Sequence, residues 1–313
     1  MNNNKQHFHL EEQISYLKKK KKAIILAHYY QDEDIQDIAD FVGDSLDLSR
    51  KAANTDSETI VFCGVKFMAE VAKILNPNKK VILPDMNAGC SLEDSCPSNK
   101  FKDFIDKNPG HTVISYINCS AEVKALSDII VTSSNAKKII DQLPKNEQII
   151  FAPDRHLGQY INNITGRKML LWQGSCIVHE TFSEKEIVKL KIRNREAEVI
   201  AHPECPEKIL RLSNFIGSTS SLLNYVQKSH SERFIVATEP HIFHQMKKKA
   251  PNKEFIVAPG SGGNCSCANC PFMELNTMEK LHECMENENP YIQMHSELME
   301  DARKPLIKML EMS

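Results

Sequence analysis

Ile24-Ile25-Leu26-Ala27-His28-Tyr29-Tyr30 is the stretch that decides the fold of this chain. It joins a short apolar run to polar side chains that can bind ligands or move protons. A run that is apolar at successive positions is typical of a parallel strand covered by helices on both faces. In open α/β sheets, ligands bind at the carboxyl ends of such strands. The stretch therefore predicts a buried strand that delivers His28 and Tyr30 to a site.

Two later stretches have the same design, and further apolar runs follow each of the three. The later stretches are Val113-Ile114-Ser115-Tyr116-Ile117-Asn118 and Val199-Ile200-Ala201-His202-Pro203-Glu204. Segments of helical length and composition lie between the runs, for example 120–126, 184–195 and 241–249. This alternation predicts an α/β architecture with parallel sheets, three times over. The expected strands are 23–27, 59–63, 81–83, 112–117, 128–132, 148–152, 168–172, 198–201, 214–217, 233–237 and 254–258.

Each of the three groups ends near a cysteine, namely Cys90, Cys176 or Cys270. About one domain length of chain separates neighbouring members of this set. If the three units point their strand ends at one shared centre, three thiolates meet there and form a metal site. Three thiolates on an iron–sulfur cluster with four corners leave one iron open as a Lewis acid.

The run Cys265-Ser266-Cys267-Ala268-Asn269-Cys270-Pro271 is a metal or redox signature in an intracellular protein. Structural zinc is the simplest alternative to iron and sulfur. Four-ligand zinc sites usually come from two close pairs of cysteines, and the sequence has no second C-x-x-C pair. An iron–sulfur centre is therefore favoured over zinc, and a redox sensor built on this run remains an alternative.

The composition is that of an ordinary globular protein, with 313 residues, of which 41% are hydrophobic and 26% charged. A formal net charge of −2 argues against nucleic acid or a membrane surface as a partner. The five lysines of 18–22 are expected to be a solvated helix end before the first strand. The polar start of the chain and the lack of any membrane-length apolar stretch favour a cytoplasmic protein. In that compartment the ten cysteines are expected to be thiols or metal ligands.

Several long motifs resemble those of the quinolinate synthases, in the same order along the chain. The resemblance extends from about Ala23 to Met273, which is most of the sequence. The motifs are Ala27-His28-Tyr29-Tyr30-Gln31, Ala39-Asp40-Phe41-Val42-Gly43-Asp44-Ser45, Ser115-Tyr116-Ile117-Asn118, Trp172-Gln173-Gly174-Ser175-Cys176-Ile177-Val178-His179, His202-Pro203-Glu204-Cys205, Gly217-Ser218-Thr219 and Cys270-Pro271-Phe272-Met273.

This resemblance implies an enzyme that condenses iminoaspartate with dihydroxyacetone phosphate to give quinolinate, the precursor of NAD. It implies three pseudo-symmetric three-layer α/β/α domains around a central cavity, with boundaries that we expect at 1–108, 109–192 and 193–313, the last including the C-terminal helices. It also implies a [4Fe–4S] cluster held by Cys90, Cys176 and Cys270. Cys265 and Cys267 are then not ligands, and their one-residue gap fits a disulfide poorly.

The resemblance also assigns roles to residues of the expected cavity. Substrate carboxylate or phosphate oxygens are expected to bind a set of polar side chains, with His28 and His202 as further donors. Glu204, with His202 beside it, is the expected general base and acid, and Tyr30 is the expected proton relay in the phosphate-losing steps. His179 is assigned either to the cluster loop or to the substrate. The oxygen-binding set is Ser45, Tyr116, Asn118, Ser133 and Thr219.

Simpler interpretations exist for individual residues and for the whole protein. His28 alone could be a structural histidine and Tyr30 a packing residue. Ser133, Ser218 and Thr219 could be helix N-caps, because Ser and Thr are favoured there. A different [4Fe–4S]-dependent hydro-lyase, a relative of the diphthamide-forming enzymes and a non-catalytic metal or redox sensor are the alternatives. An aspartate oxidase or dehydrogenase is the expected source of the iminoaspartate.

Overall fold

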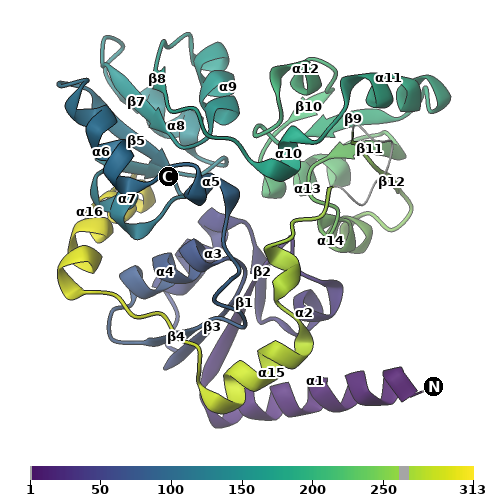
Figure 1. Ribbon diagram of the computed structural model, residues 1–313. Helices are drawn as coiled ribbons and strands as arrows, with labels where there is room; N and C mark the ends of the chain where they lie inside the picture. The colour runs from purple at the N-terminus through teal and green to yellow at the C-terminus, as the bar shows by residue number, and fades with distance from the viewer. Residues whose placement is uncertain (1, 261–267) are drawn as a thin grey trace.

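The computed structural model describes residues 2–260 and 268–313, with side chains from residue 9 onward. Cys265 and Cys267 lie outside the described residues. Three separate four-stranded sheets form the frame (Figure 1), and every strand pairing within them is parallel. The α/β fold with repeated, helix-covered parallel sheets that the sequence predicts is therefore confirmed.

Each sheet has the same strand order, with its second strand on one side of the first and its third and fourth on the other. The first sheet consists of β1 (Ala23–His28), β2 (Phe41–Gly43), β3 (Thr59–Cys63) and β4 (Lys80–Ile82). The second consists of β5 (Thr112–Tyr116), β6 (Ile129–Val131), β7 (Ile149–Ala152) and β8 (Leu170–Leu171). The third consists of β9 (Glu198–Ala201), β10 (Phe215–Ile216), β11 (Arg233–Ala237) and β12 (Glu254–Val257).

The same side-chain-to-backbone hydrogen bond, which we call the lock, recurs in all three sheets and indicates that they are repeats of one unit. In each, a side-chain oxygen just before the second strand accepts a bond from the backbone N–H of a residue 15 positions earlier in the first strand. The three bonds measure 2.8 to 2.9 Å. This register makes His28, Tyr116 and His202 equivalent. The pairs are Asp40 with Ile25, Asp128 with Val113, and Asn214 with Val199.

Alternation within the strands explains why they are apolar throughout. Ile24 and Leu26 of β1 pack into one core with the helices α3 (Ser45–Ala53) and α4 (Lys66–Leu75). Ile25 and Ala27 pack into another with α1 (Asn2–Lys20) and α15 (Met278–Asn287). The eleven strands predicted from sequence all form. β2 was not predicted, because it has only three residues and lies half-buried at the edge of its sheet.

Helices connect the strands and cover both faces of the sheets. The first unit contains α1 (Asn2–Lys20), α2 (Glu33–Ile38), α3 (Ser45–Ala53), α4 (Lys66–Leu75), α5 (Ser91–Asp94) and α6 (Ser98–Asp106). Next come α7 (Ala121–Ala125), α8 (Ala136–Gln142), α9 (Arg155–Thr165), α10 (Ile177–Glu180) and α11 (Glu184–Arg193). The remainder are α12 (Glu207–Leu210), α13 (Thr219–Lys228), α14 (Ile242–Lys249), the 3-10 turn η2 (Met273–Leu275), α15 (Met278–Asn287) and α16 (Ser296–Met312).

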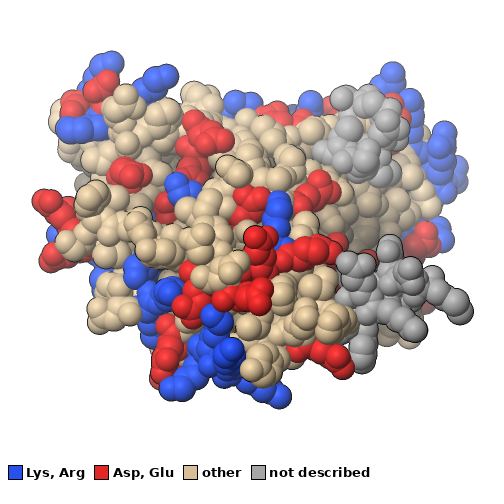
Figure 2. All heavy atoms as spheres, turned by 60° about the horizontal axis from the view of Figure 1, so that its bottom comes forward, with Lys and Arg blue, Asp and Glu red and all other residues tan. Residues whose placement is uncertain are grey.

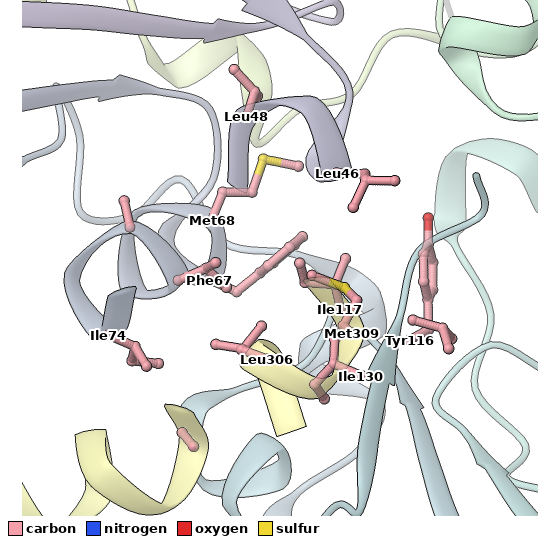
Figure 3. Close-up of a cluster of buried hydrophobic side chains, with 14 of the residues drawn as sticks. Leu46, Leu48, Phe67, Met68, Ile74, Tyr116, Ile117, Ile130, Leu306 and Met309 are labelled. Carbon is pink, nitrogen blue, oxygen red and sulfur yellow. The ribbon is translucent and has the colours of Figure 1, made fainter. Parts of the chain in front are cut away.

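The last two helices return to the earlier parts of the chain. α15 packs on α1, and α16 packs on α7, β6 and α4. As a result the first and second units share one continuous core (Figure 3), in which Phe67 of α4, Ile130 of β6 and Leu306 of α16 meet. The third sheet packs into two further cores, one of which also includes Tyr29 of the first unit.

The run of lysines at 18–22 ends α1 and immediately precedes β1, as predicted. Three of these lysines pair with acids on the first unit or on the C-terminal segment. On the face that Figure 2 presents, Lys and Arg side chains are interleaved with Asp and Glu. Among the described helices, none combines the length and apolar character needed to cross a bilayer. The pairs are Lys18 with Asp40, Lys21 with Glu288, and Lys22 with Glu58.

Candidate active site

A single cavity lies where the carboxyl ends of the three sheets converge. All twelve residues that the sequence assigns to a site line it, although they come from all three units. The cavity is lined by His28, Tyr30, Ser45, Cys90, Tyr116, Asn118, Ser133, Cys176, His202, Glu204, Thr219 and Cys270, together with Asp44, Val65, Phe67, Met68, Gly89, Ser91, Thr132, Ile177, Val178, His179, Glu239, Phe272 and Met273.

The cavity histidines at the carboxyl ends of β1 and β9, His28 and His202, are held in the same way. Tyr30 donates its backbone N–H to Nδ1 of His28 at 3.2 Å, and Glu204 donates its own to Nδ1 of His202 at 3.3 Å. Because Nδ1 accepts, the neutral ring carries its proton on Nε2. Burial lowers the pKa of each histidine to about 4. Both rings are therefore neutral N–H donors near pH 7, and Nε2 of His202 lies 3.2 Å from Oγ of Ser133.

Glu204 is almost completely buried and is held by two neighbours. Tyr116 donates its hydroxyl to Oε1 at 2.6 Å. Nδ1 of His179 lies 3.0 Å from Oε2. Burial alone would raise the pKa of Glu204, but His179, His202 and the Tyr116 hydrogen bond outweigh it and hold that pKa below its usual range.

Three hydroxyls lie on the loops that follow the second strand of each sheet. The helix caps are formed by their neighbours: Asp44 accepts bonds from Leu46 N and Asp47 N, and Ser218 accepts one from Ser221 N. Of the three residues proposed as possible caps, only Ser218 therefore acts as one. The hydroxyl-bearing residues are Ser45 at the first position of α3, Ser133 before α8, and Thr219 at the first position of α13.

These loops also hold the three units together beside the cavity. Ser134 of the second unit donates its hydroxyl to Oδ2 of Asp44 in the first unit at 2.5 Å. Its Oγ also lies 2.8 Å from Oγ of Ser218 in the third unit. One side chain therefore bridges all three loops that present hydroxyls to the cavity.

The three cavity cysteines are unpaired and partly buried. Cys90 and Cys176 occupy the N-cap positions of α5 and α10, and Cys270 lies just before η2. Burial raises the pKa of all three thiols, that of Cys270 to about 11. Deprotonating them in this dry site requires a cation, so the arrangement is suited to a metal centre.

Several residues at the site were missed by sequence reasoning or left without a definite role. His179, Glu204 and Cys176 offer ligand atoms within 4.8 Å of one another, a spacing that could hold a metal ion. Glu239 lines the cavity and accepts bonds from the backbone N–H and Nδ1 of His241, at 2.9 and 2.7 Å. Asp44 stands in one of the motifs quoted above, and Glu239 follows the predicted strand 233–237. These were the only signals that the sequence offered for the two residues.

Comparison with known proteins gives a consistent result. The family model described as Quinolinate synthetase A protein matches residues 12–311. A quinolinate synthase of Trichormus variabilis is 62% identical over 300 residues, covering 96% of this chain and 92% of the relative. One from Trichodesmium erythraeum is 59% identical over 304 residues, covering 97% of this chain and 94% of the relative. One from Synechocystis is 59% identical over 300 residues, with 96% and 94% covered.

Proposed function

The chain belongs to the quinolinate synthetase A family of enzymes, and from that premise we propose that it condenses iminoaspartate with dihydroxyacetone phosphate. The products are quinolinate, phosphate and water, and the reaction belongs to NAD biosynthesis. The observation that carries the proposal is the single buried cavity that gathers side chains of all three units. A cavity of this kind can enclose two small substrates and hold them against one another.

The proposed metal centre is a [4Fe–4S] cluster on Cys90, Cys176 and Cys270. The support is that all three thiols line the same cavity, one from each unit. When bound, such a cluster supplies an open iron that polarises a substrate oxygen. The Cys176–His179–Glu204 group favours a second candidate, a single metal ion. The two differ in whether Cys90 and Cys270 are needed for metal.

The proposed substrates carry two carboxylates and a phosphate, yet no Lys or Arg is among the described residues that line the cavity. Anionic groups would therefore be held by neutral donors. The hydroxyls of Ser45, Ser133 and Thr219 are assigned to this role. Two of them open the helices α3 and α13, whose N-termini favour negative charge. Asn118 and the Nε2–H groups of His28 and His202 complete the set.

Glu204 is the proposed general base and acid. Its neighbours keep it ionised, and it lines the cavity, so it can accept a proton from a bound substrate carbon or nitrogen. Tyr116 donates to the same carboxylate and holds it in one orientation. Tyr30, which occupies in the first unit the position that Glu204 occupies in the third, is the proposed proton relay for phosphate departure.

Iminoaspartate hydrolyses readily in water, so an aspartate oxidase or dehydrogenase acting nearby is the proposed source. A cytoplasmic location, inferred from the ten cysteines, belongs to the same proposal.

The deciding experiment begins with anaerobic purification and quantitation of iron and sulfide. Quinolinate formation from iminoaspartate and dihydroxyacetone phosphate is then measured. Turnover by protein with about four irons per chain supports the proposal. A fully loaded protein that makes no quinolinate but dehydrates another small acid would replace it with the hydro-lyase alternative.

A further inference from the structure

The hydroxyl of Thr238 lies between two side chains of the active site. Thr238 directly follows β11 and is completely buried, and it does not line the cavity itself. Its Oγ1 is 2.5 Å from the hydroxyl of Tyr30 and 3.0 Å from Nε2 of His179. It therefore contacts one residue of the first unit and one of α10.

The Thr238 hydroxyl has one proton and two lone pairs, so it can donate to at most one of these two partners. If Thr238 donates to Nε2 of His179, it must accept from Tyr30, and the lone pairs of Tyr30 remain for a ligand. If Nε2 donates to Thr238, the Thr238 proton is available to Tyr30, whose own proton can then face the cavity. The proton position on His179 therefore limits the hydrogen-bond direction at Tyr30.

His179 extends this linkage to the proposed base. Its other nitrogen, Nδ1, lies 3.0 Å from Oε2 of Glu204, whose Oε1 accepts from Tyr116. The series Tyr30, Thr238, His179 and Glu204 crosses from the first unit to the third, and all of its members except the partly exposed Tyr30 are buried. Within it Thr238 is the one member that does not line the cavity.

We propose that Thr238 is a positioning residue that orients Tyr30 and His179 together, and so couples the proton relay to the base. This inference rests on the proposed function, because it assumes that Tyr30 and Glu204 both act on substrate. A merely structural hydroxyl makes a different prediction. In that case the loss of Thr238 lowers stability and leaves the position and contribution of Tyr30 unchanged.

The test compares Thr238→Val, which keeps the shape and removes the hydroxyl, with Thr238→Ser, which keeps the hydroxyl. We expect Thr238→Val to lower kcat at least about tenfold, with KM within about twofold and iron content unchanged, as for loss of one buried hydrogen bond. Thr238→Ser should restore most of the rate. Thr165→Val is the matched control, because its hydroxyl bonds only within the end of α9, to Ile161 O and to the backbone N–H of Arg167.

A double mutant gives the sharpest readout. If Thr238 acts through Tyr30, then Tyr30→Phe combined with Thr238→Val should be little slower than Tyr30→Phe alone. Additive losses, or a wild-type kcat in Thr238→Val, would overturn the inference while leaving the proposed function intact.

Crystal structures of the holo variants test the same point without turnover. We expect the Tyr30 ring to shift or become disordered in Thr238→Val and to stay in place in Thr238→Ser. An unmoved Tyr30 in Thr238→Val contradicts the positioning role. A fully loaded wild-type enzyme that forms no quinolinate would instead contradict the proposed function, and the crystallographic comparison would still decide the role of Thr238.

Discussion

Tyr30 and Glu204 occupy equivalent places in the first and third units, two residues after a histidine, but their chemistry differs. In both units Nδ1 of the histidine accepts a hydrogen bond from the backbone N–H of the residue two positions later, and burial lowers the pKa of the histidine to about 4. In the second unit the same two places hold Tyr116 and Asn118. Repetition of the backbone therefore determines where a side chain stands, while each unit was free to change what that side chain does.

The largest effect is expected from the cysteines that close each unit. Replacing Cys90, Cys176 or Cys270 singly with Ala should remove the cluster and abolish turnover, because two thiolates do not retain it. Iron and sulfide analysis after anaerobic purification is the measurement. Replacing Cys265 or Cys267 with Ala should leave both unchanged. Full iron and sulfide in Cys90→Ala would favour the single-ion site on Cys176, His179 and Glu204.

Glu204→Gln should have the next largest effect, because it keeps the shape of the side chain and removes its negative charge. We expect kcat to fall by about 10²- to 10⁴-fold with iron content retained, the range for loss of a general base. Glu207→Gln is the control, since that exposed carboxylate pairs only with Arg211 on the surface. Wild-type turnover in Glu204→Gln would transfer the role of base to another residue.

Tyr30→Phe should have a smaller effect, because it removes one hydroxyl and keeps the ring. We expect a roughly tenfold lower kcat with an intact fold, as measured by steady-state kinetics and thermal unfolding. Tyr16→Phe on the exposed side of α1 should change neither quantity. An unaltered rate would show that Tyr30 only packs against its neighbours. The equivalent positions of Tyr30 and Glu204 would then not both serve catalysis.

Ser134→Ala tests the contact among the three loops rather than a single corner. It should lower the free energy of unfolding by about 1 kcal/mol, because the carboxylate of Asp44 loses a hydrogen bond. Denaturant unfolding is the measurement, and Ser213→Ala, whose hydroxyl bonds within its own turn, is the control. A loss no greater than that of the control would show that the bridge contributes nothing to stability.

The repeated lock should give an effect of similar size, and it offers the most direct test of equivalence. Asp128→Ala and Asn214→Ala each remove one bond to a strand N–H, so each should cost about 0.5–1.5 kcal/mol of unfolding free energy. Similar costs from urea titrations would confirm that the second and third units use the lock alike. Costs that differ by more than about 1 kcal/mol would contradict equivalence.

The sequence alone predicted the strands well because burial on both faces leaves a local signal. It failed for β2, where a three-residue edge strand carries no such signal. The residues that it assigned to a site do line the cavity, because strand ends and motifs are also local. It could not foresee Thr238 between Tyr30 and His179, since those contacts join residues 208 and 59 positions apart. Such contacts depend on how the three units pack together.

The recurring lock at Asp40, Asp128 and Asn214 has a further consequence for recognition. A ring of three identical subunits would surround a small molecule with the same groups three times, so an unsymmetrical ligand could settle in three degenerate poses. Here one polypeptide supplies all three units, and the cavity is lined by a histidine–tyrosine, a tyrosine–asparagine and a histidine–glutamate pair. An unsymmetrical ligand rotated by a third of a turn would therefore meet different side chains, and only one of its three poses would match them.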